Sequence, residues 1–219
     1  MAAASRRAGR DFGGISLMAV SKTFPPDLLR EAYQAGLRLF GENRVQEFTA
    51  KVEGLRDLAE AEWHMIGHLQ ANKSAKAVEL FGAVDSVDSL RLARRLNASA
   101  AEAGKQLPIL IEINIGGERA KSGVAPQSPD LEAMWAEAPQ WDALQIVGLM
   151  SVPPYAEDPQ EARPYFRQLR ELWERIAARN LPQVKMNTLS MGMSHDFEVA
   201  IEEGSTCVRV GTAIFGDRT

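Results

Sequence analysis

Chemically active side chains in this sequence come directly after short apolar runs. Lys22 follows an apolar run that ends at residue 20, and Pro25 and Pro26 stiffen the backbone behind it. A lysine at the end of a strand most often reaches into solvent. Held inside a pocket instead, where desolvation and a nearby cation favour the neutral amine, the same side chain becomes a nucleophile.

Arg209 is a candidate for that nearby cation. In a strand with strict alternation, Cys207, Arg209 and Gly211 share one face, and Val208 and Val210 share the other. An arginine on an interior face needs a partner, because leaving a buried charge unpaired costs about 3–5 kcal/mol. A structural carboxylate or a ring nitrogen of a ligand would satisfy it.

Small residues near the end of the chain could hold an anion. Ser190 and Thr212 offer hydroxyl donors, and Gly192 and Gly211 leave backbone N–H groups uncovered. The pattern also predicts a helix that begins at Ser194, whose first N–H groups would point the same way. The alternative is that Ser194 is only an N-cap and that the glycines are turn residues.

Other kinds of site find no support in the sequence. His64 and His68 would lie about 13 Å apart on a strand, and no cluster of cysteines or carboxylates completes a metal shell around them. Nucleophile-elbow, Walker and dinucleotide-binding motifs do not occur. Asp85 and Glu42 do not make up the acid and base of a barrel hydrolase. Because the two histidines are far apart and lack further ligands, we expect no metal site.

The composition is that of a globular chain with a substantial core. The 219 residues are 45% hydrophobic and 25% charged, which excludes disorder. The net charge of −4 argues against a nucleic-acid binder, and the single cysteine cannot form an internal disulfide. No apolar run approaches the roughly 20 residues of a membrane span. Residues 1–10 are basic, as in a transit peptide, but they are few, and we expect a cytoplasmic protein.

Short β-type runs alternate with helical patterns along the chain. The predicted strands are 15–20, 37–40, 63–66, 82–84, 109–115, 145–150, 188–190 and 207–214. The predicted helices are 26–35, 44–58, 72–80, 89–103, 131–137, 161–178 and 194–202. Strict alternation predicts parallel pairing with right-handed crossovers, and eight strands are the number that closes a (β/α)8 barrel. A doubly wound open sheet is the alternative, but its usual glycine-rich loop is missing after the first strand.

We therefore expect one α/β domain over residues 1–219, a TIM-type barrel. Such a fold brings the polar strand ends, including Lys22, Asn43, Ser190 and Arg209, onto one rim, where barrels carry their sites. No eighth helix follows the last predicted strand. The short segment before the first strand must then cover the seam of the ring.

Five runs of residues resemble one known family. They are AVSKT at 19–23, FGENRVQE at 40–47, HMIGHLQANK at 64–73, SMGMS at 190–194 with Asp196 behind it, and VRVGTAIFG at 208–216. In this order they are similar to the pyridoxal phosphate homeostasis protein family, from about Gly14 to Arg218. The family usually has a longer first helix than residues 1–10 provide.

The resemblance implies a barrel like the N-terminal domain of alanine racemase, without its additional C-terminal β-domain, that binds pyridoxal 5′-phosphate (PLP). Lys22 would form the Schiff base, Arg209 would face the pyridine nitrogen, and Asn43 would line the ring pocket. The phosphate would be held by Ser190, Gly192, Gly211 and Thr212. The implied function is intracellular PLP homeostasis without turnover, by a monomer, with PLP-requiring apo-enzymes as partners and no contact with nucleic acid or membrane.

A PLP-dependent amino-acid racemase on the same barrel is the alternative function. A racemase needs a proton-transfer group on each face of the cofactor, and Lys22 supplies only one. In racemases of this type the second group is a tyrosine from the extra domain. Tyr155 is the one tyrosine near the predicted rim. The carrier function is therefore favoured.

Overall fold

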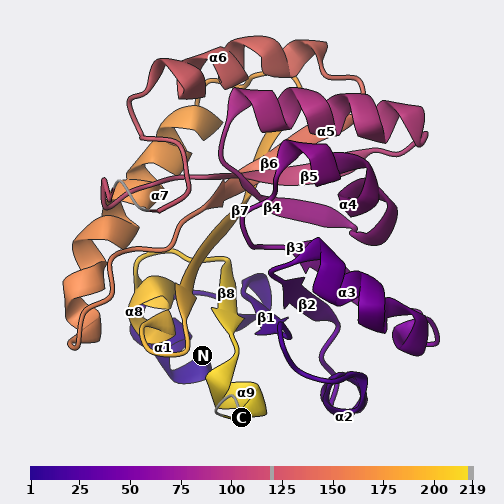
Figure 1. Cartoon of the computed structure of the whole chain (residues 1–219). Coiled ribbons are helices and arrows are strands. Elements are labelled where there is room, and N and C mark those ends of the chain that lie inside the picture. Colours follow the sequence, from indigo (N-terminus) through magenta and orange to yellow (C-terminus); the bar gives the residue numbers. More distant parts are fainter. Residues whose placement is uncertain (119–120, 217–219) are drawn as a thin grey trace.

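Eight parallel strands close into a barrel in the computed structural model, which describes residues 1–118 and 121–216 (Figure 1). Strands adjacent in the chain are adjacent in the barrel, and β1 pairs with β8 to complete the ring. The strands are β1 (Ser16–Val20), β2 (Leu39–Glu42), β3 (Glu62–Met65), β4 (Ala83–Val87), β5 (Leu107–Glu112), β6 (Leu144–Met150), β7 (Val184–Met193) and β8 (Cys207–Val210). The predicted barrel is confirmed.

Helices cover the outside of this barrel (Figure 1). The α-helices are α1 (Ala2–Arg7), α2 (Pro26–Gln34), α3 (Val45–Lys51), α4 (Ser74–Leu80), α5 (Leu90–Glu102), α6 (Pro129–Glu137), α7 (Arg163–Ala177), α8 (Phe197–Glu202) and α9 (Thr212–Phe215). In α7, Phe166, Leu169, Leu172 and Ile176 recur at helical spacing and are buried against the core. None of the described helices has the length and apolar character needed to span a bilayer.

Several element boundaries differ from the predicted ones, and two of the differences lie at the rim. β8 ends at Val210 rather than at 214, because the Gly211 carbonyl accepts the N–H groups of Ile214 and Phe215 and turns the chain into α9. The helix expected from Ser194 begins at Phe197 instead. The Asp196 side chain accepts the Met193 N–H at 2.6 Å, and β7 runs on to that methionine.

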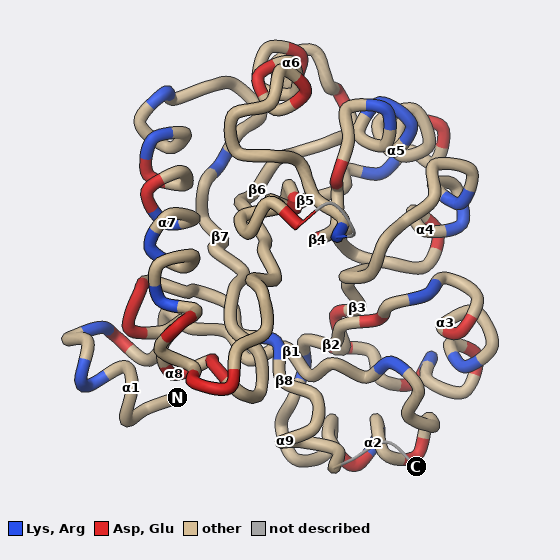
Figure 2. The backbone as a smooth tube through the Cα atoms, turned by 60° about the vertical axis from the view of Figure 1, so that its left-hand side comes forward, with Lys and Arg blue, Asp and Glu red and all other residues tan. Residues whose placement is uncertain are grey.

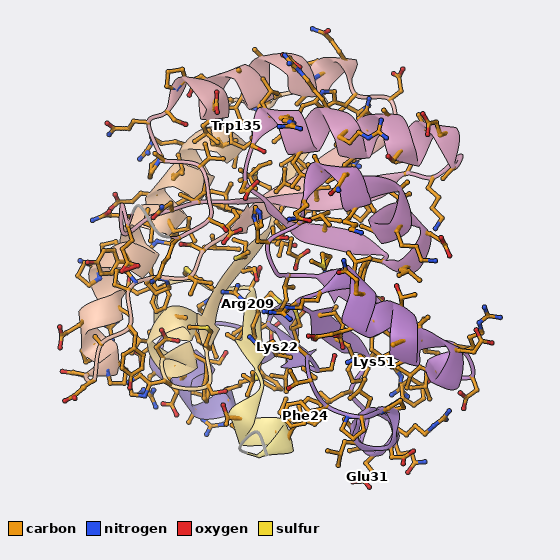
Figure 3. The ribbon with its side chains drawn as sticks, in the orientation of Figure 1. Lys22, Phe24, Glu31, Lys51, Trp135 and Arg209 are labelled. Atoms are coloured by element: carbon orange, nitrogen blue, oxygen red, sulfur yellow. The ribbon has the colours of Figure 1, made fainter. Side chains whose placement is uncertain are left out.

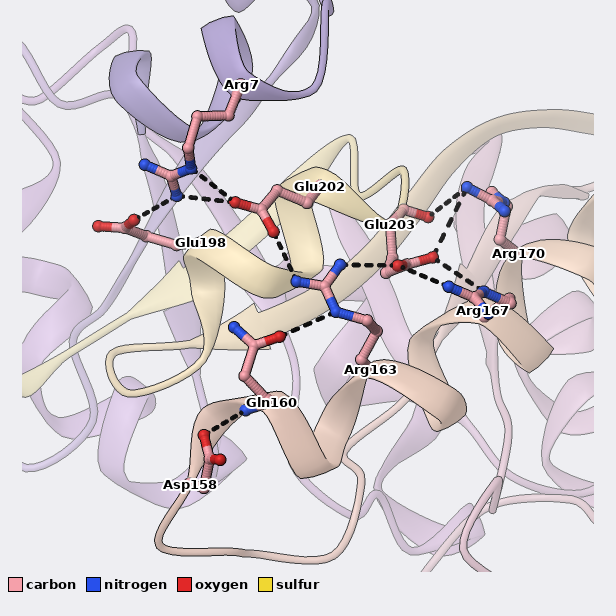
Figure 4. A network of polar contacts seen from close by, with 9 residues as sticks. All are labelled: Arg7, Asp158, Gln160, Arg163, Arg167, Arg170, Glu198, Glu202 and Glu203. Carbon is pink, nitrogen blue, oxygen red and sulfur yellow. Dashed lines mark hydrogen bonds and ion pairs between the residues drawn. The ribbon is translucent and has the colours of Figure 1, made fainter.

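The seam between β8 and β1 is covered by α1 and α8. Ala4 of α1 packs with Ile201 of α8 and with Val208 of β8. Arg7 forms ion pairs with the Glu198 and Glu202 carboxylates at 2.6 and 2.8 Å, and an arginine of α7 also contacts Glu202 (Figure 4). Figure 2 shows the acidic side of α8 beside the arginines of α1. The short helix α1 thus covers the seam, held in place by apolar packing and by the ion pairs between Arg7 and α8.

Candidate functional site

A cavity of about 390 Å³ opens at the carboxyl ends of the strands. Lys22 follows β1, Asn43 follows β2, Arg209 lies near the end of β8, and Gly211 and Thr212 come directly after β8; all five line this cavity. Figure 3 shows Lys22 and Arg209 side by side at the barrel mouth. The structure therefore brings together five of the seven predicted site residues.

Lys22 stands in a tight turn that follows β1. The N–H of Phe24 donates to the Ser21 carbonyl at 3.2 Å, which closes the turn around Lys22 and Thr23. Thr23 has a φ of 68°, a left-handed conformation that a β-branched residue rarely adopts and that costs about 1–3 kcal/mol. Such a turn persists only where its surroundings hold it. It places the half-buried Lys22 on the cavity wall.

Arg209 is 4% exposed, and it reaches the cavity with one part of its side chain. Its guanidinium donates to the Ser190 hydroxyl at 2.6 Å and to the Ser151 carbonyl at 2.8 Å. Burial lowers the pKa of Arg209, while Cys207 and Asp85 act in the opposite direction. Among the described residues no carboxylate forms an ion pair with it. The positive charge therefore remains available on the cavity wall.

Ser190 and Gly192 lie outside the cavity. Ser190 is fully buried, and its hydroxyl oxygen accepts the hydrogen bond from Arg209. Gly192 has a φ of 93°, and a Cβ there would lie 2.5 Å from the Ala200 side chain and 3.0 Å from the Phe197 Cα. Close packing against α8 thus explains this glycine. Their predicted phosphate contacts stay a prediction; within the protein, Ser190 bonds to Arg209 and Gly192 packs against α8.

Ser194, which comes directly after β7, is the serine of this segment that reaches the cavity. Its side chain lines the cavity, and its hydroxyl oxygen accepts the Gly211 N–H at 3.3 Å. Thr212 lines the same cavity. Hydroxyl and backbone N–H groups from the ends of β7 and β8 therefore meet in one place, an arrangement that suits a phosphate. From the sequence, Ser194 is only the expected start of a helix or, in the alternative, its N-cap, although it lies in the run of small residues considered for an anion.

A third wall of the cavity comes from the loop after β6. Val152 and Tyr155 line it together with His195. The Tyr155 side chain is 79% exposed, and its ring centroid lies 5.7 Å from that of His195. Sequence reasoning named Tyr155 but missed Val152 and His195, because neither belongs to a motif.

Other titratable groups stand near the site without lining it. Glu112, at the end of β5, has its pKa raised to about 7 by burial and by the negative charge of Asp88, against the influence of Arg209. His64 pairs with Asp85 at 3.1 Å inside the barrel, where both line a separate cavity of about 280 Å³. His68 pairs with Asp88 at 2.9 Å. The two histidines thus serve different carboxylates.

Comparison with known proteins places this fold. Residues 2–219 match the family described as alanine racemase, N-terminal domain. An alanine racemase of Clostridium difficile shares the fold with a TM-score of 0.73 at 13% identity, over 99% of this chain and 55% of that one. The chain is therefore a barrel of the alanine racemase type.

Closer relatives narrow the family. A protein of Aquifex aeolicus is 45% identical over 98% of this chain and 92% of its own length, and one of Escherichia coli K12 is 41% identical over 100% and 92%. Both are named pyridoxal phosphate homeostasis protein. The structure of PipY from Synechococcus elongatus with PLP bound has a TM-score of 0.85 at 40% identity, covering 98% of each chain. The chain belongs to the pyridoxal phosphate homeostasis protein family.

Proposed function

We propose that this protein holds PLP in the cavity at the barrel mouth and serves intracellular PLP homeostasis by binding and releasing it. The observation that carries the proposal is the meeting of Lys22, Arg209 and the Ser194–Gly211–Thr212 group in one cavity. A 40% identical relative that covers 98% of this chain has been solved with PLP bound. Its binding of PLP supports the same cofactor here.

The residues present fit PLP. When bound, PLP supplies an aldehyde that joins a lysine amine as a Schiff base with loss of water. Lys22 offers the amine for this bond. The Ser194 and Thr212 hydroxyls would donate to the phosphate, with Gly211 holding the Ser194 hydroxyl, and Arg209 would direct its positive charge to the ring nitrogen. Asn43 lines the same cavity and would stand beside the ring.

The same residues favour holding PLP over turnover. A guanidinium opposite the pyridine nitrogen opposes protonation there, because two positive charges would meet in a poorly solvated place. An unprotonated ring is a weaker electron sink. A second proton-transfer group opposite Lys22 would have to be Tyr155, whose side chain is 79% exposed. A phenol this exposed is poorly suited to proton transfer at the cofactor, which is why we place the racemase alternative second.

We further propose that one domain, residues 1–219, acts as a monomer that passes PLP to PLP-requiring apo-enzymes. The half-buried Lys22 and the exposed Tyr155 in the cavity lining would leave the cofactor accessible from outside. No step in holding PLP requires a second chain, since every group named above comes from this one.

Borohydride reduction of the PLP-loaded protein tests the proposal. Reduction makes the bond to lysine permanent, and peptide mapping then identifies the lysine. We expect the adduct on the peptide that contains Lys22, and we expect Lys22→Ala to lose both the adduct and the visible absorbance band. An adduct mainly on Lys73 or Lys121 would contradict the assignment.

A further inference from the structure

A carboxylate is buried in the layer between the barrel and its helices. Glu42, at the end of β2, has no exposed surface. Burial raises the pKa of Glu42, and the ammonium of Lys51 opposes that rise. Buried ion pairs are often no more stabilising than apolar residues of similar size. The presence of this pair therefore calls for a role other than stability.

The contacts of Glu42 connect it to β1 and α3. One carboxylate oxygen, Oε1, accepts the Ser21 hydroxyl at 2.6 Å and pairs with Lys51 Nζ at 2.7 Å. The other oxygen, Oε2, has no hydrogen-bond partner in the part of the chain that the structure describes. Glu42 thus directs its bonding toward Ser21 and Lys51, at the cost of one unsatisfied acceptor.

Lys51 in turn holds the backbone of the Lys22 turn. Its side chain is 10% exposed, and Nζ donates to the Ser21 carbonyl at 3.0 Å and lies 3.5 Å from the Phe24 carbonyl. These two carbonyls stand on either side of Lys22 and Thr23. Figure 3 shows Lys51 on the side of Lys22 and Phe24 that faces α3. A single buried ammonium therefore joins the two ends of a turn that contains a left-handed threonine.

We propose that Glu42 and Lys51 are positioning residues for Lys22, holding its turn so that the amine meets the PLP aldehyde. The inference rests on the proposed function of Lys22. Neither residue of the pair lines the cavity. In the step concerned, the Lys22 nitrogen bonds to the aldehyde carbon and the carbonyl oxygen leaves as water. The pair would act on this step by holding the backbone turn that positions Lys22 Nζ, and it would not contact the phosphate group.

Two ligands separate this role from a purely structural one. PLP can form the bond to Lys22, whereas pyridoxine 5′-phosphate carries an alcohol in place of the aldehyde and cannot. The variant is Glu42→Leu with Lys51→Met, which fills the layer with apolar side chains and leaves the Ser21 hydroxyl its contact with the Gly41 carbonyl at 3.3 Å. We expect PLP affinity to fall about tenfold, the factor that 1.4 kcal/mol represents, with pyridoxine 5′-phosphate affinity unchanged.

The rate and stability of the same variants complete the test. We expect the borohydride-trappable fraction to form more slowly in the double variant, while the melting temperature of the apo-protein stays near that of the wild type. Lys51→Arg keeps a cation that can donate to both carbonyls, and we expect it to retain the preference for PLP. The matched control is Lys76→Met, which removes an exposed lysine paired with Glu79 on α4.

The outcomes are distinguishable. Equal losses of PLP and pyridoxine 5′-phosphate affinity in the double variant would show a structural role and overturn the inference. Unchanged PLP affinity in the double variant would also overturn it, while the loss of the adduct in Lys22→Ala would leave the proposed function intact. Persistence of the adduct in Lys22→Ala would overturn the proposed function itself. If the double variant is unstable, the ratio measured for Lys51→Gln decides in the same way.

Discussion

Lys51 and Arg209 are both buried beside the cavity, and they differ in what surrounds their charges. The Lys51 ammonium pairs with the Glu42 carboxylate at 2.7 Å and supports backbone carbonyls. Arg209 donates to a hydroxyl and a carbonyl, and within the described residues no carboxylate pairs with it. A cation neutralised in this way is suited to hold backbone groups in place. A cation buried without a counter-charge costs free energy that a ligand can offset.

The difference indicates which of two similar buried cations is suited to contact a ligand directly. Burial alone does not separate them, since their side chains are 10% and 4% exposed at most. The partners do. The same difference in partners separates Ser190 from Ser194, four residues further on. The Ser190 hydroxyl accepts a hydrogen bond from Arg209, whereas Ser194 lines the cavity.

Removing the charge of Arg209 is the strongest test of this comparison. Arg209→Gln keeps an amide that can donate to the Ser190 hydroxyl but carries no charge. We expect PLP affinity to fall by about 10–100-fold, the range for losing a hydrogen bond from a charged group, measured by titration of the visible band. Affinity within twofold of the wild type would show that the charge of Arg209 does not face the ligand.

The two serines allow the comparison to be sharpened at the phosphate. Ser194→Ala with Thr212→Val removes two donors, and we expect PLP affinity to fall by about tenfold or more. Pyridoxal, which lacks the phosphate, should lose little. Ser190→Ala is the contrast, because its hydroxyl bonds to Arg209, and it should weaken both ligands to a similar, smaller extent. A phosphate-selective loss in Ser190→Ala would reverse this assignment.

Much of this arrangement could be predicted from the sequence. The alternation of β-type runs with helical patterns predicted the barrel. The place of Lys22 after the first strand, and of Arg209 on the interior face of the last strand, predicted where these two side chains lie. The choice between Ser190 and Ser194 could not be made, because it depends on β7 continuing to Met193 and on Asp196 accepting that N–H. Lys51 was missed because it lies on a helix, and its long side chain reaches back to β1.

The effect expected at Glu112 is on stability alone and leaves ligand affinity unchanged. Its pKa is raised to about 7 in the folded protein, well above the ordinary value for glutamate. At a pH below the ordinary pKa of glutamate, the Glu112 carboxyl is protonated in both the folded and the unfolded protein. As pH rises toward 7 the unfolded chain ionises first, so the folded state loses stability, by at most about 3 kcal/mol above pH 7.

Glu112→Gln removes this titration. We expect its melting temperature to rise relative to the wild type between pH 5 and pH 8, with PLP affinity at pH 5 unchanged. Thermal unfolding at matched ionic strength measures the difference. A melting-temperature difference that does not vary with pH would show that Glu112 titrates normally.

Exchange of the amino-acid α-proton with deuterated water tests most directly that the protein holds PLP without turning over amino acids. Alanine, serine and glutamate are incubated with the PLP-loaded protein, with Lys22→Ala as the control, and exchange is followed by NMR. The account predicts changes in the absorbance spectrum on adding amino acids, with no Lys22-dependent exchange at enzymatic rates. Lys22-dependent exchange at about one per second or faster would contradict it and support a racemase.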